Sequence, residues 1–325
     1  MKKIIVLLFL ILIPYKVNAI SAQSSVVMDL DNGRIIHANN IDDQRLIASI
    51  TKIMTCIVAI EDGNLDKQVV VGEEVLKAYG SAIYIEIGEK LTLKDLLMGL
   101  MLRSGNDAAV VIAKNIAGSM EAFVSLMNEE AAKIGMKNTI FYNDHGLEEN
   151  NGKGNLSTAR DMALLTKYAM NNATFREIFK TKKYTVKTNK KNYSWTNKNK
   201  LLHSYDFITG GKTGYTEKAR RTLVTTASNN NINLVVVTLN DGNDWADHIS
   251  LYKDIFQKYE AVKVLRKDKL KIKGDKVYKD DILYINEDVY VPVLPNEKTK
   301  LKIEYQLNND TKYIDGDEVG VANIY

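Results

Sequence analysis

Ser49 and Lys52 are the two residues whose types and spacing most directly suggest chemistry. They open an apolar run with helical spacing, and residues i and i+3 of a helix lie on the same face. If the helix begins at or just before Ser49, a neutral lysine at position 52 can take the proton of the serine hydroxyl. Burial or a second nearby cation can make a lysine neutral near pH 7. The free N–H groups and dipole of the helix N-terminus would also stabilise a developing negative charge. The pair therefore predicts an activated serine.

The same spacing recurs at Ser250 and Lys253, so it is not specific by itself. That second pair lies in the amphipathic stretch 245–259, which carries no other chemical signal. We interpret Ser250 and Lys253 as positions on a surface helix.

A second polar feature interrupts two strongly apolar helical stretches, 93–102 and 107–116, at Arg103, Ser104, Gly105 and Asn106. Buried polar side chains need partners, so this loop faces either a polar network or a substrate cleft. Taken alone, the loop is better explained as a helix–helix turn with local side-chain caps.

A third feature is the segment 208–216, which contains Lys212, Thr213 and Gly214 and is followed by two clear strands at 222–227 and 234–239. Glycines at 210, 211 and 214 predict a strand edge over which another molecule passes closely. The segment is not a phosphate-binding P-loop, because the glycine spacing differs and a strand follows where a helix is required.

The remaining elements alternate strands and helices around these features. A hairpin is predicted at 25–30 and 34–38 and a central buried helix from Ser49 to about Gly63. Further helices are predicted at 120–134, at 159–170 with Ser157 as its cap, and at 245–259. A lysine-rich hairpin is predicted at 181–204, and short alternating runs from about Lys263 predict a small β-domain.

Length, composition and charge narrow the class of protein. The 325 residues are 45% hydrophobic and 26% charged, which is enough for an enzyme core. The net charge of +4 falls to +1 without the three lysines of the first 19 residues, which does not favour nucleic-acid binding. The four histidines and the single cysteine, Cys56, show no metal-ligand spacing, so no metal or other cofactor is expected, and Cys56 is expected to be a small buried residue.

The N-terminus has the pattern of a secretory signal peptide over residues 1–19. Lys2 and Lys3 precede an apolar stretch at 4–13, and Val17 and Ala19 provide small residues for cleavage. We therefore expect an extracytoplasmic protein, with no clear membrane anchor after signal cleavage.

The three motifs, in this order and in these contexts, resemble those of the penicillin-binding serine peptidases, and most closely the low-molecular-mass D-alanyl-D-alanine carboxypeptidases of bacteria. The resemblance covers roughly residues 22–260 and is carried by the segments 48–55, 102–109, 143–147, 157–161 and 211–216. It implies an α/β (α+β) fold, with an antiparallel sheet, flanking helices and a helical subdomain. The small β-domain, 263–325, would follow, and it is shorter than in many relatives.

The resemblance also implies a role for each site residue. Ser49 is similar to the nucleophile, with Lys52 as its base. Ser104 and Asn106 would relay the proton to the leaving amine and hold the peptide, and Lys212 would keep the site positive. Thr213, Gly214 and Tyr215 would bind substrate, with the backbone N–H groups of Ser49 and Tyr215 forming the oxyanion hole. The partners implied are a peptidoglycan stem peptide ending in D-Ala-D-Ala and β-lactam antibiotics.

Two positions differ from the pattern common in such relatives, and two other functions compete with the main one. Arg220 stands where a glycine is usual, and Asn155 stands where many relatives carry a histidine.

A non-hydrolytic penicillin- or peptidoglycan-binding module remains an alternative function. A serine β-lactamase is disfavoured, because neither Glu148 nor Glu149 is followed four residues later by an asparagine.

Overall fold

The computed structural model of the chain describes residues 20–149, 152–272, 277–278, 282–308, 313–314 and 316–324. The predicted signal peptide, residues 1–19, lies outside the described residues.

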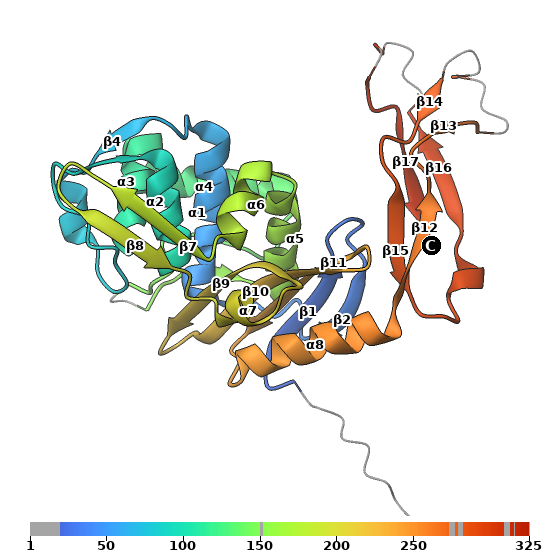
Figure 1. Ribbon diagram of the computed structural model, residues 1–325, viewed down its shortest axis with the longest axis horizontal. Coiled ribbons are helices and arrows are strands. Elements are labelled where there is room, and N and C mark those ends of the chain that lie inside the picture. Colours follow the sequence, from blue (N-terminus) through green and yellow to red (C-terminus); the bar gives the residue numbers. More distant parts are fainter. Residues whose placement is uncertain are drawn as a thin grey trace, which may run out of the picture.

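An antiparallel sheet of order β2-β1-β11-β10-β9 forms the middle layer of the larger part of the molecule (Figure 1). Its strands are β1 (Ser24–Asp29), β2 (Ile35–Asn39), β9 (Ile208–Thr216), β10 (Arg220–Asn229) and β11 (Ile232–Leu239). Side chains alternate between two apolar cores: Val26 and Met28 of β1 pack on one side and Val27 on the other. The sheet is therefore covered on both faces, and β9 forms one of its edges.

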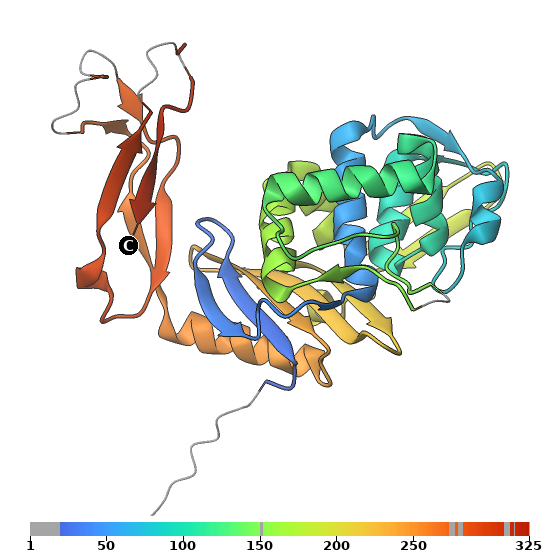
Figure 2. The ribbon, with the colours of Figure 1, turned by 180° about the vertical axis from the view of Figure 1, so that it is seen from behind.

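Six helices form a layer on the first face of the sheet, which we call the helical layer. They are α1 (Lys52–Asp62), α2 (Leu93–Arg103), α3 (Asn106–Ala117), α4 (Met120–Ile134), α5 (Ala159–Met170) and α6 (Ala173–Lys180). The helix α1 runs through the middle of this layer (Figure 2), and every residue from Lys52 to Ile60 is buried. Cys56 is one of these buried residues, as predicted. The central position of α1 shields its first turn from water.

The opposite face carries α7 (Lys200–Ser204) and α8 (Asp244–Lys258), whose apolar side chains form the second core with β10 and β11.

No single helix in the described ranges is long and apolar enough to cross a membrane. One bent pair, α3 with α4, is long and apolar enough only when the two helices are taken together.

The predicted helices and strands are confirmed within a few residues, with two exceptions. The N-cap of α5 is Thr158, whose side chain accepts from the backbone N–H of Asp161, so the prediction of Ser157 as cap was wrong by one residue. The helices α6 and α7 were not predicted, and α7 occupies the end of the stretch 181–204, so the hairpin predicted there is confirmed only over residues 183–196. The shorter elements are β3 (Arg45–Leu46), β4 (Gln68–Val70), β5 (Lys90–Thr92), β6 (Leu156–Ser157), β7 (Lys183–Lys187), β8 (Asn192–Thr196), and the 3-10 turns η1 (Ala48–Thr51) and η2 (Glu73–Lys77).

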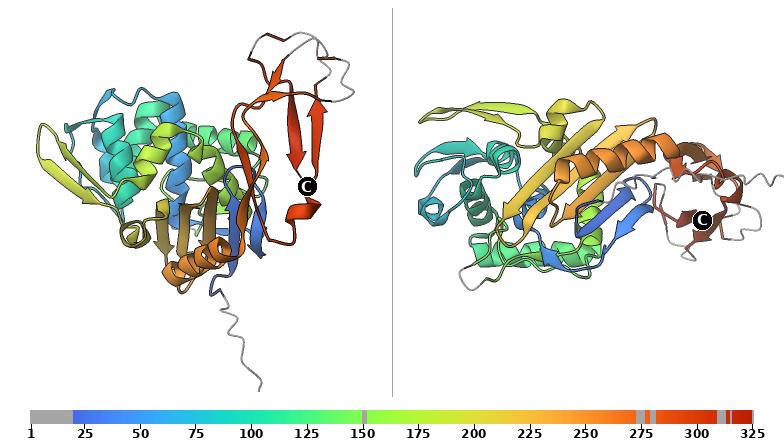
Figure 3. Two further views of the ribbon diagram at one scale, coloured as in Figure 1. Left: turned by 45° about the vertical axis from the view of Figure 1, so that its right-hand side comes forward. Right: turned by 90° about the horizontal axis from the view of Figure 1, so that it is seen from below.

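The C-terminal strands stand apart from the sheet and the helical layer (Figure 3). They are β12 (Glu260–Leu265), β13 (Lys269–Leu270), β14 (Leu283–Tyr284), β15 (Val289–Val293), β16 (Ile303–Leu307) and β17 (Gly320–Ile324), with the turn η3 (Lys298–Lys300). Arg34 joins them to the β1–β2 hairpin through the Pro292 carbonyl at 2.7 Å and Glu297 at 2.9 Å. We propose the predicted division into a domain at 22–260 and a β-domain at 263–325, which this limited contact supports.

The segment Asn143 to Leu147 supports the turn that carries Ser49. Gly146 has φ +90°, and a Cβ atom on it would lie 2.0 Å from the Ala48 carbonyl oxygen, so only glycine allows this approach. Ala48 itself has φ +48°, a conformation that non-glycine residues rarely adopt. The turn η1 is thus held in a strained conformation by its neighbours.

Gly146→Ala is therefore expected to destabilise the fold and displace Ser49. The left-handed backbone alone costs about 1–3 kcal/mol, and the clash with Ala48 adds to it. Gly135→Ala is the matched control, because Gly135 has φ +86° with no atom near its Cβ position. Urea denaturation of both variants measures the difference. Equal losses of unfolding free energy would show that the Gly146–Ala48 contact does not hold the turn.

Candidate active site

Ser49 lies in the turn η1, and Lys52 is the first residue of α1. The two side chains meet across one helical turn, with 3.1 Å between Lys52 Nζ and Ser49 Oγ. Ser49 is partly exposed, whereas Lys52 is completely buried. The expectation that a helix begins near Ser49 and brings the pair together is confirmed, with the serine placed on a 3-10 turn that leads into the α-helix.

The environment of Lys52 favours its neutral form. The pKa of Lys52 is lowered to about 7, mainly by burial; the charge of Asp144 acts in the opposite direction, and the charge of Lys198 acts in the same direction as burial. Its amine also donates to the His145 carbonyl oxygen at 2.6 Å. A substantial fraction of Lys52 is thus able to accept a proton at neutral pH.

Ser104 reaches the same site from the break between α2 and α3. It ends α2 in the left-handed conformation, at φ +63°. Its hydroxyl accepts from the buried Lys212 Nζ at 3.1 Å. Burial, followed by the charges of Lys52 and Lys198, lowers the pKa of Lys212 well below its usual range. The loop therefore faces a polar network, which is one of the two possibilities that its sequence left open.

Asn106 is placed differently from Ser104. It is buried at the start of α3, where its side-chain amide donates to the Tyr79 carbonyl oxygen at 2.5 Å and its backbone N–H donates to the Ser81 carbonyl oxygen at 2.7 Å. Its Oδ1 atom has no hydrogen-bond partner among the described residues. Asn106 thus lies behind the cleft surface and holds the loop that carries Ser81.

The strand β9 supplies the other wall of the site. Lys212 pairs with Val224, which packs in the core under the helical layer, whereas Thr213 pairs with Leu223, which packs in the core under α8. The side chains of Lys212 and Thr213 therefore lie on opposite faces of the edge strand.

Gly214 lets β9 approach the serine turn. A Cβ atom at this position would lie 2.3 Å from Thr222 Oγ1 and 2.9 Å from the backbone nitrogen of Ser49. Thr222 in turn donates to the Ile47 carbonyl oxygen at 2.9 Å, which ties η1 to β10. Gly214 therefore permits the close approach of the chain's own serine turn, whereas the passage of another molecule over this strand edge stays a prediction.

A cleft of about 570 Å³ opens at this junction. Of the predicted site residues, it is lined by Ser49, Ser104, Thr213, Gly214 and Tyr215, and Lys52 and Lys212 contact Ser49 and Ser104 from below. Its other lining residues, which sequence reasoning missed, are Ser81, Lys198, Arg221, Asp244 and Trp245.

Arg221 is the most informative of these additional residues. It pairs with Tyr215 while Thr213 pairs with Leu223, so Arg221 is the diagonal cross-strand neighbour of Thr213 on one face of the sheet. Its Nη1 atom lies 3.4 Å from Oδ1 of the buried Asp244, and its side chain is half exposed. A guanidinium held in this way presents donors to an anion bound at Thr213.

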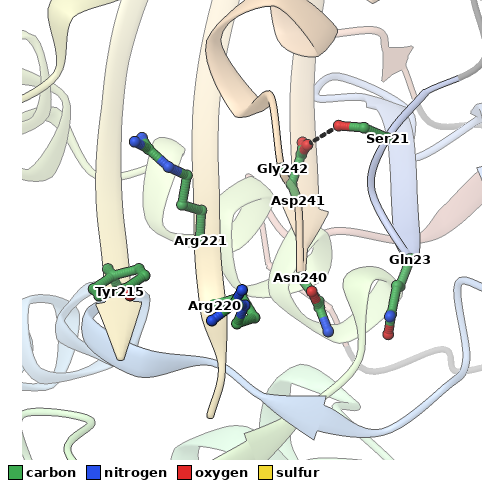
Figure 4. A pocket seen from close by; sticks show the side chains of 8 residues that line it. All are labelled: Ser21, Gln23, Tyr215, Arg220, Arg221, Asn240, Asp241 and Gly242. Atoms are coloured by element: carbon green, nitrogen blue, oxygen red, sulfur yellow. Dashed lines mark hydrogen bonds between the residues drawn. The ribbon is translucent and has the colours of Figure 1, made fainter. Parts of the chain in front are cut away.

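A second cavity of about 370 Å³ adjoins the cleft, and Tyr215 and Arg221 line both (Figure 4). Its other lining residues are Ser21, Gln23, Arg220, Asn240, Asp241 and Gly242. Arg220 has φ +58°, a conformation that glycine adopts freely. The left-handed entry into β10 is therefore present although an arginine occupies the position.

Asn155 supports the serine turn from below. Its Nδ2 atom donates to Thr51 Oγ1 and to the Asn143 carbonyl oxygen, both at 2.9 Å, and its Oδ1 accepts from the backbone N–H of Tyr142 at 2.7 Å.

Ser250 and Lys253 have the same spacing as Ser49 and Lys52. They lie on α8, where Lys253 is exposed, as predicted.

Comparisons with known proteins agree with this geometry. The sequence profile of the D-alanyl-D-alanine carboxypeptidase family matches residues 14–243. The chain is 35% identical over 224 residues to the D-alanyl-D-alanine carboxypeptidase DacF of Bacillus subtilis, a match that covers 66% of this chain and 56% of that protein. It is 30% identical over 315 residues to DacA of Escherichia coli, covering 90% of this chain and 76% of that protein.

Among solved structures, penicillin binding protein 5 from Haemophilus influenzae superposes with a TM-score of 0.77 at 28% identity, over 94% of this chain and 93% of that one. The family match covers most of the chain, and the superposition extends over the sheet, the helices and the C-terminal strands. The chain belongs to the D-alanyl-D-alanine carboxypeptidase family.

Proposed function

We propose that this chain is a serine D-Ala-D-Ala carboxypeptidase that removes the terminal D-alanine from peptidoglycan stem pentapeptides through an acyl-enzyme on Ser49. The observation that carries the proposal is the 3.1 Å contact between Ser49 Oγ, at the surface of the cleft, and the buried Lys52 amine, whose pKa is about 7. A partly exposed serine beside a neutral buried amine is an activated nucleophile.

In acylation, neutral Lys52 takes the proton of Ser49 as Oγ attacks the carbonyl carbon between the two D-alanines. The backbone N–H groups of Ser49 and Tyr215 are suited to stabilise the oxyanion, because Gly214 brings β9 against the serine turn. The C–N bond then breaks, and the leaving amine needs a proton. Ser104 is placed to relay to this amine the proton that Lys52 accepted, because it lines the same cleft and is hydrogen-bonded to Lys212. Water then attacks the ester carbonyl and gives a proton to neutral Lys52, which returns it to Ser49 Oγ as the acyl C–O bond breaks and the shortened peptide leaves.

Two hydrogen-bond donors for the free carboxylate of the substrate lie on the face of β9 opposite to Lys212. Thr213 offers a hydroxyl, and Arg221 offers a guanidinium diagonally across the strand pair. Charge-assisted hydrogen bonds to a carboxylate are about twice as strong as neutral ones. This arrangement selects a peptide that ends at the cleft and so favours a carboxypeptidase over an endopeptidase.

β-lactam antibiotics are proposed as inhibitors that acylate the same serine, and the place of action is proposed to be the bacterial cell wall, outside the cytoplasm. Family membership and the N-terminal signal pattern support both points. No specific observation favours a β-lactamase, since the Glu148 carboxylate accepts from Thr216 Oγ1 at 2.6 Å and is thereby engaged away from the Ser49–Lys52 pair.

The activity itself is tested by incubating the purified protein and Ser49→Ala with a fluorescent penicillin and with diacetyl-Lys-D-Ala-D-Ala. We expect covalent label and free D-alanine from the wild type and neither from Ser49→Ala. Label without D-alanine would instead identify a non-hydrolytic penicillin-binding module.

The rate of penicillin acylation is expected to rise with pH through about 7. Lys52 acts as a base only when neutral, and its neutral fraction grows as the pH passes its pKa of about 7. Lys52→Arg keeps the positive charge but stays protonated, so it should be inactive from pH 5 to pH 9. A wild-type rate that does not change over this range would exclude Lys52 as the base.

Arg221→Gln is expected to lower kcat/KM for the free-acid tripeptide by about 10- to 100-fold, mainly through KM, because one charged hydrogen bond is lost. The same tripeptide with a C-terminal amide should show almost no difference between wild type and variant. The control is Arg220→Gln, because Arg220 lines only the adjoining cavity. Equal losses for the acid and the amide would rule out carboxylate recognition by Arg221.

A further inference from the structure

Asp144 is a buried acid that the steps above do not use. Its exposed fraction is 0%, and neither carboxylate oxygen has a hydrogen-bond partner among the described residues. The only ion-pair contact found for it there is with His145 Nε2, at 4.0 Å from Oδ1. A carboxylate without partners in a protein interior is unfavourable, because burial removes its hydration. Its place in the fold therefore calls for an explanation other than stability.

Two hydrogen bonds from α1 hold this acid beside the serine site. Thr55 Oγ1 donates to the Asp144 carbonyl oxygen, and Lys52 Nζ donates to the carbonyl oxygen of the next residue, His145, both at 2.6 Å. Lys52 and Thr55 lie three residues apart and share one face of α1. The backbone that carries Asp144 is thus held against the turn of α1 that contacts Ser49.

The charges of the two residues act on each other. The pKa of Asp144 is raised to about 6, because the effect of burial exceeds the opposing effect of the Lys52 charge. After burial, the charge of Asp144 has the largest effect on the pKa of Lys52, and it raises that pKa. Asp144 is therefore ionised in the same pH range in which Lys52 loses its proton.

The other charged groups around the pair do not replace Asp144. The charge of Lys198 lowers the pKa of Lys52, burial holds the pKa of Lys212 well below its usual range, and burial together with the charge of Lys52 lowers the pKa of His145 to about 3, so none of these three groups supplies a negative charge. Asp107 also favours the Lys52 ammonium, but its carboxylate is occupied by backbone N–H groups of residues 83–85. Asp144 is the unoccupied anion of the cluster.

We propose that Asp144 is a positioning residue for the charge of the general base: its buried carboxylate stabilises the protonated form of Lys52 and so sets the pH at which Ser49 becomes nucleophilic. The inference rests on the proposed function of Lys52 as base. Without the acid, Lys52 would lose its proton at lower pH and would be a weaker proton acceptor once neutral.

The test is the pH dependence of second-order acylation by a fluorescent penicillin, from pH 5 to pH 9, in the full chain. Asp144→Asn is expected to move the acid limb of the profile by roughly one pH unit to lower pH and to lower the plateau rate. Asp144→Ala removes the same charge and should move the limb in the same direction, which covers the case in which the asparagine variant folds poorly.

Thr55→Val is the matched control, because it breaks the bond to the Asp144 carbonyl oxygen without changing any charge. It should lower the melting temperature and leave the acid limb in place, whereas Asp144→Asn should keep or raise the melting temperature. An unchanged acid limb in both Asp144 variants would overturn the proposal and make Asp144 a structural residue. Failure of the wild type to be acylated at any pH would instead refute the proposed function.

Discussion

The burial of one amine, that of Lys52, is the constraint on which the rest of the site depends. A lysine holds its proton tightly in water and can act as a base near neutral pH only where burial or a neighbouring cation lowers its pKa. The helical layer provides that environment, because α1 runs through its middle and its first nine residues are buried. The sheet covers the remaining side, so the apolar packing that stabilises the fold also makes the lysine reactive.

The site forms where two parts of the fold meet. The helical layer contributes Ser49, Lys52 and Ser104, and the edge strand β9 contributes Lys212, Thr213 and Tyr215. The two parts can meet only where their backbones come closer together than a residue with a Cβ atom would permit. Gly214 and Gly146 allow this on two sides of the serine turn, and positive φ angles are adopted by Ala48 in that turn and by Ser104 at the end of α2. Such strain persists because the surrounding packing over-determines the turn.

Burial of the polar groups of the site is unfavourable for stability, although the proposed mechanism requires it. Lys52, Lys212 and Asp144 are all buried, and each would be better solvated at the surface. Stability gained elsewhere, from the two apolar cores on either side of the sheet, offsets this cost. The cluster is therefore the place where conservative substitutions are most informative about mechanism, because they change charge with little change in volume.

The sequence by itself determined most of the longer helices and strands and the residues of the three motifs, and the resemblance of these motifs to a known family implied the fold class. These features depend on local physics: the periodicity of apolar residues, the caps of helices and the glycines at a strand edge are visible within a few residues of one another. It also determined that Ser49 and Lys52 could meet, because they lie within one helical turn.

Only the tertiary structure decided which other side chains share the cleft. Arg221 lies diagonal to Thr213 because of the register between β9 and β10, and Asp144 lies against α1 through hydrogen bonds to residues about 90 positions away in the chain. It also separated Ser104, at the cleft surface, from Asn106, which lies behind it. Such relations depend on strand register and helix packing, and no local pattern specifies which distant side chains those bring together.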